Sequence, residues 1–158
     1  MHVVVTGGAG FLGSRLAREL LAAGSLPVAG RRARPLSRLT LVDRAPAPPD
    51  LASDERVSLV RDDLVELLDN EATARDTLGG AEVVFHLAAA VSGECEADFD
   101  LGLRANLQAT EALLASCRAL GTNPVVVFSS SVAVFGGPAE TVITDGTWPT
   151  PQTSYGTP

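Results

Sequence analysis

Three glycines near the N-terminus have the spacing of a phosphate-binding turn. Gly7, Gly10 and Gly13 follow Val3–Val5, an apolar run with the composition of a buried strand. Glycines at such positions permit a tight turn, a close approach of the backbone to a pyrophosphate, and close packing of helix on sheet. The N–H groups and the dipole at the start of the following helix then hold the anion without a lysine. The spacing Gly-x-x-Gly-x-x-Gly predicts a dinucleotide site, and a purely structural glycine turn is the alternative.

An aspartate ends the second predicted strand, and its position indicates which dinucleotide is bound. A carboxylate there accepts hydrogen bonds from both hydroxyls of the adenosine ribose and repels a 2′-phosphate, so Asp43 favours NAD over NADP. Its separation from Gly13 exceeds the usual ~20 residues, which an insertion at Ser25–Arg38 explains. The Arg44 guanidinium would tolerate a 2′-phosphate and keeps NADP open. An ordinary strand-end aspartate in a turn is the other interpretation.

Composition excludes several classes of function. The chain has 158 residues, of which 46% are hydrophobic and 20% charged, which fits one folded domain over residues 1–158. Its net charge of −7 disfavours binding to nucleic acid. We find no leader and no apolar run of about 20 residues, so we expect no membrane association and a cytoplasmic location. Two cysteines and two histidines without clustering indicate neither a disulfide framework nor a metal site, and we expect Cys117 to be a buried thiol.

Strand-like runs alternate with segments of helical spacing along the chain. The predicted strands are His2–Thr6, Leu39–Asp43, Val57–Arg61, Glu82–Leu87 and Pro124–Ser130. The nearly continuous apolar runs Val3–Val5 and Val125–Phe128 indicate strands covered by helices on both faces. The pattern therefore predicts an α/β protein of Rossmann type, with a three-layer, doubly wound parallel sheet in the strand order 3-2-1-4-5.

Two helices carry most of the helical signal. The first is predicted over Phe11–Ala23 and closed by Gly24, with Leu12, Leu16 and Leu20 forming the stripe that faces the sheet. The second is predicted over Asp98–Leu120 and ended by Gly121. Its apolar face is predicted to hold Phe99, Leu103, Leu107, Thr110, Leu113, Leu114 and Cys117.

Two segments break this pattern and are predicted to be loops. Ser25–Arg38 carries four arginines, for which a solvated insertion and an anion site are both open interpretations. Phe135–Pro158 is rich in Gly, Pro and Thr and is expected to form the active-site loop region. At the end of the fourth strand, the small residues Ala88 and Ala89 leave room for a dinucleotide, and His86 is expected to be a structural hydrogen-bonding residue.

Several motifs in order along the whole chain resemble the extended short-chain dehydrogenase/reductase family, also called the NAD-dependent epimerase/dehydratase family. They are Thr6-Gly7-Gly8-Ala9-Gly10-Phe11-Leu12-Gly13, Asp63-Leu64, His86-Leu87-Ala88-Ala89, Asn106, Ser129-Ser130-Ser131 and Tyr155. Within the family, the D-erythronate dehydrogenase branch is the most similar. The segments that carry this narrower resemblance are residues 91–94, 96–102, 133–137 and 151–156.

The resemblance implies a cofactor and a reaction. The implied NAD-binding residues are Gly7, Gly10, Phe11, Leu12, Gly13, Asp43, Asp63, Leu64, Ala88, Ala89, Asn106 and Tyr155. Asp63 would receive the adenine amino group and Leu64 would cover the ring. Tyr155, as phenolate, would take the proton of a substrate hydroxyl while hydride passes to NAD, and Ser131 would bind the same oxygen. The implied substrate is a sugar acid, with D-erythronate giving the 2-oxo acid, and the implied full-length assembly is a homodimer.

The family's Tyr-x-x-x-Lys spacing would place the lysine immediately after Pro158. That ammonium lowers the pKa of the tyrosine and anchors the nicotinamide ribose, so we expect these residues alone to bind NAD with little or no turnover. The family's C-terminal half, with most substrate contacts, would also follow. We therefore expect an unpaired apolar edge on the fifth strand and a substrate-binding arginine outside this segment.

Two other functions stay open. A sugar-nucleotide epimerase or dehydratase would share every cofactor residue and differ mainly in the C-terminal half. A non-catalytic NAD-binding module would keep the glycines and Asp43 without needing a completed Tyr/Lys pair. A serine hydrolase is disfavoured, because the Gly-x-Ser-x-Gly elbow is missing from the sequence.

Overall fold

The computed structural model describes residues 1–137 and 142–158. Its strands are β1 (His2–Thr6), β2 (Ser25–Leu26), β3 (Arg34–Pro35), β4 (Arg38–Asp43), β5 (Val57–Arg61), β6 (Ala81–His86) and β7 (Val125–Phe128). Its helices are α1 (Phe11–Ala23), α2 (Pro49–Ala52), α3 (Leu64–Asp69), α4 (Glu71–Leu78), α5 (Ser92–Ala97), α6 (Phe99–Gly102) and α7 (Ala109–Leu120). A π-helix, η1 (Leu103–Gln108), joins α6 to α7, and a 3₁₀ turn, η2 (Val132–Val134), follows β7.

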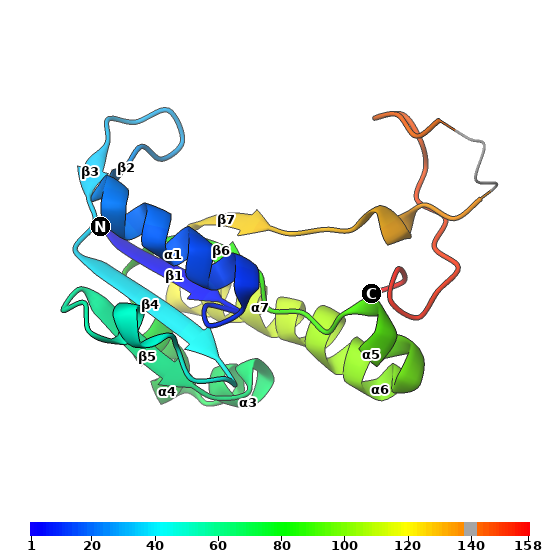
Figure 1. Cartoon of the computed structure of the whole chain (residues 1–158), viewed down its shortest axis with the longest axis horizontal. Coiled ribbons are helices and arrows are strands. Elements are labelled where there is room, and N and C mark those ends of the chain that lie inside the picture. The colour runs from blue at the N-terminus through cyan, green and yellow to red at the C-terminus, as the bar shows by residue number, and fades with distance from the viewer. Residues whose placement is uncertain (138–141) are drawn as a thin grey trace.

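The main sheet has five parallel strands in the order β5-β4-β1-β6-β7. Numbered along the chain, these strands are in the order 3-2-1-4-5, so the predicted topology is confirmed. Their carboxyl ends lie at one edge of the sheet, where the loops after β1, β4, β5 and β6 come together (Figure 1). In a doubly wound sheet this edge is where ligands bind.

Helices cover both faces of the sheet, which confirms the three-layer prediction. Val4 faces a cluster formed with α3, α4 and α7, whereas Val3 and Val5 face a second cluster formed with α1 and α2. All three valines are fully buried, because successive side chains of a strand point to opposite faces. β1 is therefore the central strand, and the glycine turn that follows it starts from the most buried part of the protein.

The first helix has the predicted bounds, and Gly24 ends it in the left-handed conformation. Its predicted apolar stripe is partly wrong. Leu20 is buried, but Leu12 is 60% exposed, because it lies in the first turn of α1, beyond the edge of the sheet. Ala17 packs in the core cluster on this face of the sheet, and Gly13 packs against Gly7 and Gly8 of the glycine turn.

The second predicted helix, Asp98–Leu120, is interrupted. The chain forms α6, η1 and α7 in succession, and Gly121 ends α7 as predicted. A π-helical segment changes the number of residues per turn, so side chains on either side of it no longer share one face. Leu113 and Cys117 are buried as expected, but Phe99, Leu107 and Leu114 are exposed.

Two further expectations need correction. Ser25–Arg38 is not simply a loop, because β2 and β3 pair in it as a short antiparallel ribbon. β7 is not covered on both faces: it is the edge strand, and Val125, Val127 and Phe128 are all exposed. The expected apolar edge is therefore present. Phe135–Pro158 contains neither helix nor strand among its described residues, and 138–141 lie outside the described part.

Candidate functional site

The glycine turn after β1 is held against both neighbouring strands. The N–H groups of Gly7 and Gly8 donate to the carbonyl of Val42 on β4, at 2.8 and 3.2 Å. Gly7 has a φ of +69°, and a Cβ there would lie 2.8 Å from the backbone nitrogen of Ala88 after β6. A Cβ on Gly13 would overlap the Gly7 carbonyl oxygen. The turn is compact because these positions carry no side chain, as the glycine spacing predicts.

The start of α1 has the features of an anion site. Gly10 is its N-cap and has no side chain with which to cap the first-turn N–H groups. No acidic residue lies in that first turn either. The partial positive charge at this helix end is therefore left for a ligand. Phe11 and Leu12, which open the helix, both line the adjoining cavity.

Asp43 shapes the same turn from the end of β4. Its Oδ2 accepts the Ala9 N–H at 2.9 Å, and its Oδ1 accepts the Ala45 N–H at 2.9 Å. The carboxylate is half-buried and lines the cavity beside the glycines. The structure thus adds a role that spacing did not predict: Asp43 fixes the conformation of the glycine turn.

These groups surround one cavity of about 440 Å³, here called the dinucleotide cavity. Ten of the twelve predicted cofactor residues line it: Gly7, Gly10, Phe11, Leu12, Gly13, Asp43, Asp63, Leu64, Ala88 and Ala89. Asn106 and Tyr155 line a neighbouring cavity that shares Ala88 and Ala89. The fold therefore brings together residues that are up to 82 positions apart in sequence.

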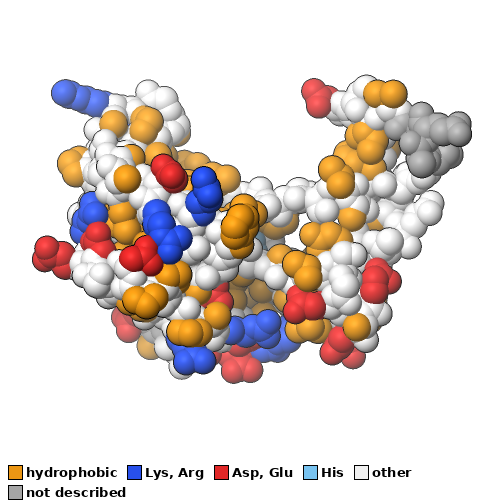
Figure 2. Space-filling model, in the orientation of Figure 1, with side chains coloured by type: hydrophobic (Ala, Val, Ile, Leu, Met, Phe, Trp, Pro, Cys, Tyr) orange, Lys and Arg blue, Asp and Glu red, His pale blue; other side chains and the backbone are white. Residues whose placement is uncertain are grey.

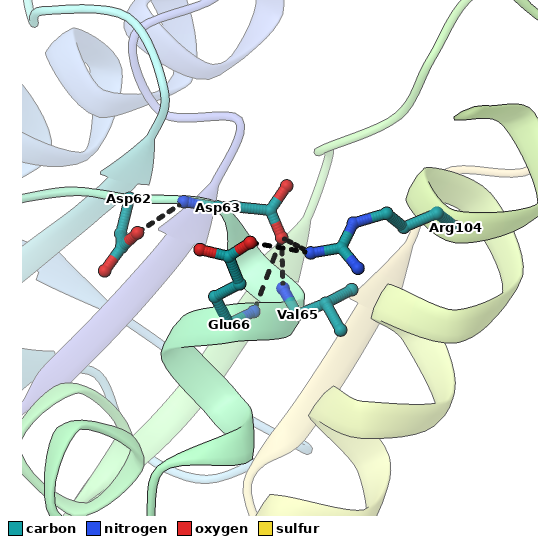
Figure 3. Close-up of polar contacts among 5 residues, drawn as sticks. All are labelled: Asp62, Asp63, Val65, Glu66 and Arg104. Carbon is teal, nitrogen blue, oxygen red and sulfur yellow. Dashed lines mark hydrogen bonds and ion pairs between the residues drawn. The ribbon is translucent and has the colours of Figure 1, made fainter. Parts of the chain in front are cut away.

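Asp63 is held by an interaction that sequence analysis missed. Its Oδ1 caps α3 by accepting the N–H groups of Val65 and Glu66, at 3.0 and 3.4 Å. The same oxygen accepts Nη2 of Arg104 at 2.9 Å, and Arg104 also reaches Glu66 Oε1 at 3.2 Å (Figure 3). Arg104 comes from η1 and lines the dinucleotide cavity. Because periodicity assumed a regular helix here, it offered no signal for this contact.

Asn106, also on η1, holds the chain that leaves β6. Its Oδ1 accepts the Ala90 N–H at 2.8 Å and its Nδ2 donates to the Ala90 carbonyl at 3.1 Å. This paired contact fixes the backbone just after Ala88 and Ala89. Asn106 is thus placed to support the cavity wall.

His86 is a structural residue, as expected. Its Nδ1 lies 2.6 Å from Thr6 Oγ1 and its Nε2 lies 3.0 Å from Thr110 Oγ1. The side chain is buried, and burial lowers its pKa. With both ring nitrogens engaged, the histidine ties β1, β6 and α7 together.

Ser131 and Tyr155 line one small cavity of about 140 Å³, here called the hydroxyl pocket. Ser129 and Ser130 line it as well, and Ala88 and Ala89 separate it from the dinucleotide cavity. Ser131 Oγ accepts the Ala133 N–H at 3.2 Å and begins η2. The two predicted catalytic residues, 24 positions apart in sequence, therefore line the same pocket.

Contacts on two sides hold the segment that carries Tyr155. On one side, the Thr150 N–H donates to the Val134 carbonyl at 2.9 Å, and a Cβ on Gly156 would overlap the Ala133 carbonyl oxygen. On the other, Ser154 Oγ donates to Glu96 Oε1 at 2.7 Å and lies 3.0 Å from the Cys95 carbonyl oxygen. Glu96 on α5 is a second residue that sequence analysis did not single out.

Charge is distributed unevenly around these cavities. Acidic side chains gather over the α5–α6 end of the molecule (Figure 2), where the sequence has four acidic residues and no basic one between 92 and 102. Among the described residues that line the hydroxyl pocket, none is Lys or Arg. Within the described ranges, no group of three or more His, Cys, Asp or Glu side chains is placed to hold a metal ion. Likewise, no described helix is both long enough and apolar enough to cross a membrane.

Comparison with known proteins agrees with this arrangement. Residues 3–157 match the family described as the NAD dependent epimerase/dehydratase family. The chain belongs to that family. The predicted resemblance is therefore confirmed for nearly the whole chain.

Two curated relatives of this chain have the same name, D-erythronate dehydrogenase. The chain is 52% identical over 157 residues to D-erythronate dehydrogenase of Cupriavidus necator, covering 99% of this chain and 46% of that protein. It is 40% identical over 160 residues to D-erythronate dehydrogenase of Haemophilus influenzae, with the same two coverages. The solved structure of MoeE5 in complex with UDP-glucose and NAD is also similar, with a TM-score of 0.75 and 34% identity over 99% of this chain and 44% of that one. The chain thus spans less than half the length of these relatives.

Proposed function

We propose that this chain is the dinucleotide-binding part of an NAD-dependent oxidoreductase that oxidises a hydroxyl of a sugar acid, with D-erythronate giving the 2-oxo acid. The observation that carries the proposal is the convergence of the glycine turn, the uncapped start of α1 and Asp43 on one cavity. The glycine turn and the start of α1 suit a pyrophosphate, and Asp43 suits the hydroxyls of a ribose. The two D-erythronate dehydrogenases among its relatives support the choice of substrate.

The order of the strands supports a position for each part of the dinucleotide. The turn after β1 and the start of α1 would hold the pyrophosphate, and Asp43 after β4 would bind the adenosine ribose hydroxyls. β5 is the next strand outward, so the residues after it, Asp63 and Leu64, are placed to contact the base. A carboxylate there would accept the adenine amino group. Asp43 also favours NAD over NADP, since a 2′-phosphate would meet its negative charge.

The hydroxyl pocket would supply the proton chemistry. NAD, when bound, accepts a hydride. Oxidation of an alcohol also releases the hydroxyl proton, and Tyr155 as phenolate would accept it while the C–O bond becomes a carbonyl. Ser131 would donate a hydrogen bond to the same substrate oxygen and keep it oriented. Ala88 and Ala89, which line both cavities, would let the hydride donor and acceptor approach each other.

The phenolate needs a nearby cation, and the described lining of the hydroxyl pocket includes neither Lys nor Arg. At pH 7 only about 0.1% of a tyrosine with an ordinary pKa of ~10 is ionised. The sequence contains no lysine. We therefore expect these 158 residues to bind NAD with little or no turnover, and the family's lysine to raise turnover by placing a positive charge beside the tyrosine hydroxyl.

A sugar acid also needs a positively charged partner for its carboxylate. The described lining of the hydroxyl pocket includes neither Lys nor Arg, and the nearby α5–α6 end is acidic. We propose that a basic residue outside these 158 residues binds the substrate carboxylate. Saturable binding of D-erythronate to the 158-residue chain in a calorimetric titration would contradict this.

Reduction of NAD tests the whole proposal. A protein extended beyond Pro158 should reduce NAD in the presence of D-erythronate, as measured by NADH absorbance, and Tyr155→Phe should lower kcat at least about a hundredfold. The Phe variant keeps the shape of the ring and loses only the hydroxyl, so its NAD affinity should change far less than its kcat. Equal kcat values for the two proteins would remove Tyr155 from the reaction.

A second candidate function rests on the likeness to MoeE5, which is solved with UDP-glucose and NAD. A sugar-nucleotide epimerase or dehydratase would use the same dinucleotide cavity. Assaying the extended protein with UDP-glucose beside D-erythronate separates the two, since only the true substrate class should be turned over.

A further inference from the structure

Arg104 lines the dinucleotide cavity from η1, and neither sequence spacing nor the family resemblance assigns it a role. Arg44, after β4, also lines this cavity. Its Nη2 lies 2.9 Å from Asp63 Oδ1 and 3.2 Å from Glu66 Oε1. The side chains of Arg104 and Asp63 are 39% and 28% exposed. An ion pair that water reaches this easily adds little to folding stability. We expect the Arg104–Asp63 pair to affect the orientation of the Asp63 carboxylate more than the stability of the fold.

The three hydrogen bonds described for the Asp63 carboxylate are all on one of its oxygens. Oδ1 accepts from the Val65 N–H, the Glu66 N–H and Arg104 Nη2. Figure 3 shows Oδ2 pointing away from all three donors. Two backbone donors and a guanidinium converge from α3 and from η1, so the carboxylate is gripped from both sides and its rotation is restricted.

We propose that Arg104 is a positioning residue for base recognition: it locks Asp63 so that Oδ2 is presented to the exocyclic amino group of adenine. This inference rests on the proposed function, because it assumes that a dinucleotide occupies the cavity. By saturating Oδ1, Arg104 leaves Oδ2 as the acceptor for the base. Arg104 also places one positive charge between the carboxylates of Asp63 and Glu66 at the start of α3.

The test compares NAD with nicotinamide hypoxanthine dinucleotide, in which an oxo group replaces the adenine amino group. A carboxylate accepts a hydrogen bond from the amino group but meets the oxo group as a second acceptor. We expect the purified protein to bind NAD at least about tenfold more tightly than the hypoxanthine analogue, the discrimination of one hydrogen bond to a charged group. Calorimetry gives both dissociation constants.

Arg104→Gln should reduce this ratio to within about threefold, chiefly through weaker binding of NAD. Arg104→Lys keeps a cation on the same helix and should restore part of the ratio. The matched control is Arg75→Gln, which breaks the exposed Arg75–Glu71 pair on α4, outside the dinucleotide cavity, and should leave the ratio unchanged. A purely structural role for Arg104 would change thermal stability or both affinities together and leave the ratio as it is.

The outcomes distinguish a failure of the role proposed for Arg104 from a failure of the proposed NAD binding. An unchanged ratio in Arg104→Gln overturns the role of Arg104, as does a wild-type protein that binds both dinucleotides equally, while NAD binding itself stands. If Arg104→Gln does not fold, Arg104→Lys provides the test. An affinity ratio between the two dinucleotides equal to that of wild type would contradict the proposal that the guanidinium of Arg104 orients Asp63. Absence of NAD binding by folded wild-type protein overturns the proposed function as well.

Discussion

The dinucleotide cavity and the hydroxyl pocket lie on either side of Ala88 and Ala89, yet they are built differently. The glycine turn of the first is braced by backbone hydrogen bonds to β4 and follows a fully buried strand. The second shares a wall with the core through His86 and Thr110, but its other wall is formed by the end of an exposed edge strand and by the segment that carries Tyr155. Side chains such as Ser154 and Glu96 hold that segment in place. If the proposed function holds, NAD binding depends mainly on the core of the fold, and proton transfer depends more on contacts at the surface.

The largest effect is expected from adding a side chain inside the glycine turn. In Gly13→Ala the new methyl group would overlap the Gly7 carbonyl oxygen, so α1 must move away from the turn. We expect a loss of at least about 3 kcal/mol in the free energy of unfolding and no measurable NAD binding. Gly93→Ala is the control, since a Cβ there meets nothing within 4 Å. Chemical denaturation and calorimetry give the two quantities, and NAD binding by Gly13→Ala at wild-type affinity would contradict the comparison.

A smaller effect is expected at Asp43, whose carboxylate holds the glycine turn and is proposed to bind the ribose as well. Asp43→Asn removes the charge but keeps an oxygen for the Ala9 N–H, so the turn should survive. We expect NAD affinity to fall about tenfold to a hundredfold, and the preference for NAD over NADP to shrink because the repulsion of a 2′-phosphate is lost. Dissociation constants for both dinucleotides check this. An unchanged preference would show that Arg44 or another group sets it.

The hydroxyl pocket should respond in kcat rather than in NAD affinity. Glu96→Gln weakens the two hydrogen bonds that Glu96 Oε1 accepts from the Ser154 hydroxyl and N–H. In the extended protein we expect kcat to fall roughly fivefold to twentyfold, since a Tyr155 displaced by a fraction of an ångström transfers protons less well. The exposed Glu111 on α7 offers a control, Glu111→Gln. A change in NAD affinity with kcat unaltered would reverse the assignment of the two regions.

The smallest effect concerns stability at mildly acidic pH. Burial lowers the pKa of His86 in the folded state, so the unfolded chain binds the proton more readily below its ordinary value of 6.5. Stability is therefore complete above pH 6.5 and declines as the pH falls below it, with a limit of about 1.4 kcal/mol per pH unit for one proton. His2, whose pKa burial also lowers, adds to the slope in the same direction.

His86→Gln should flatten the dependence of the unfolding free energy on pH between 7 and 5. Denaturation at several pH values checks this. A variant with the wild-type slope would show that His86 contributes nothing to it.

Residue patterns along the sequence predicted the features that depend on the buried sheet. Strand order, the bounds of α1 and the glycine turn followed from alternation, spacing and steric demand, because few alternatives satisfy them together. The same patterns failed where contacts between distant parts of the chain determine helix geometry or side-chain exposure. The π-helix at Leu103–Gln108 changed which side chains face inward, and the exposure of β7 could not be inferred from its composition.

Some residues of the candidate site could be identified from the sequence, and others could not. Gly7, Gly13 and Asp43 could be identified because backbone geometry at a strand end restricts the residue type. Arg104 and Glu96 could not, since each acts through a partner 41 or 58 positions away and nothing in the local pattern marks either one. Such pairs become visible only when the fold brings them together.

Titration of the purified, folded protein with NAD in a calorimeter tests the central claim most directly. The account predicts saturable binding at one site per chain, abolished by Gly13→Ala and retained in Gly93→Ala. Heat that fails to saturate, or equal binding by Gly13→Ala and the parent, would contradict the claim that the turn after β1 holds the dinucleotide.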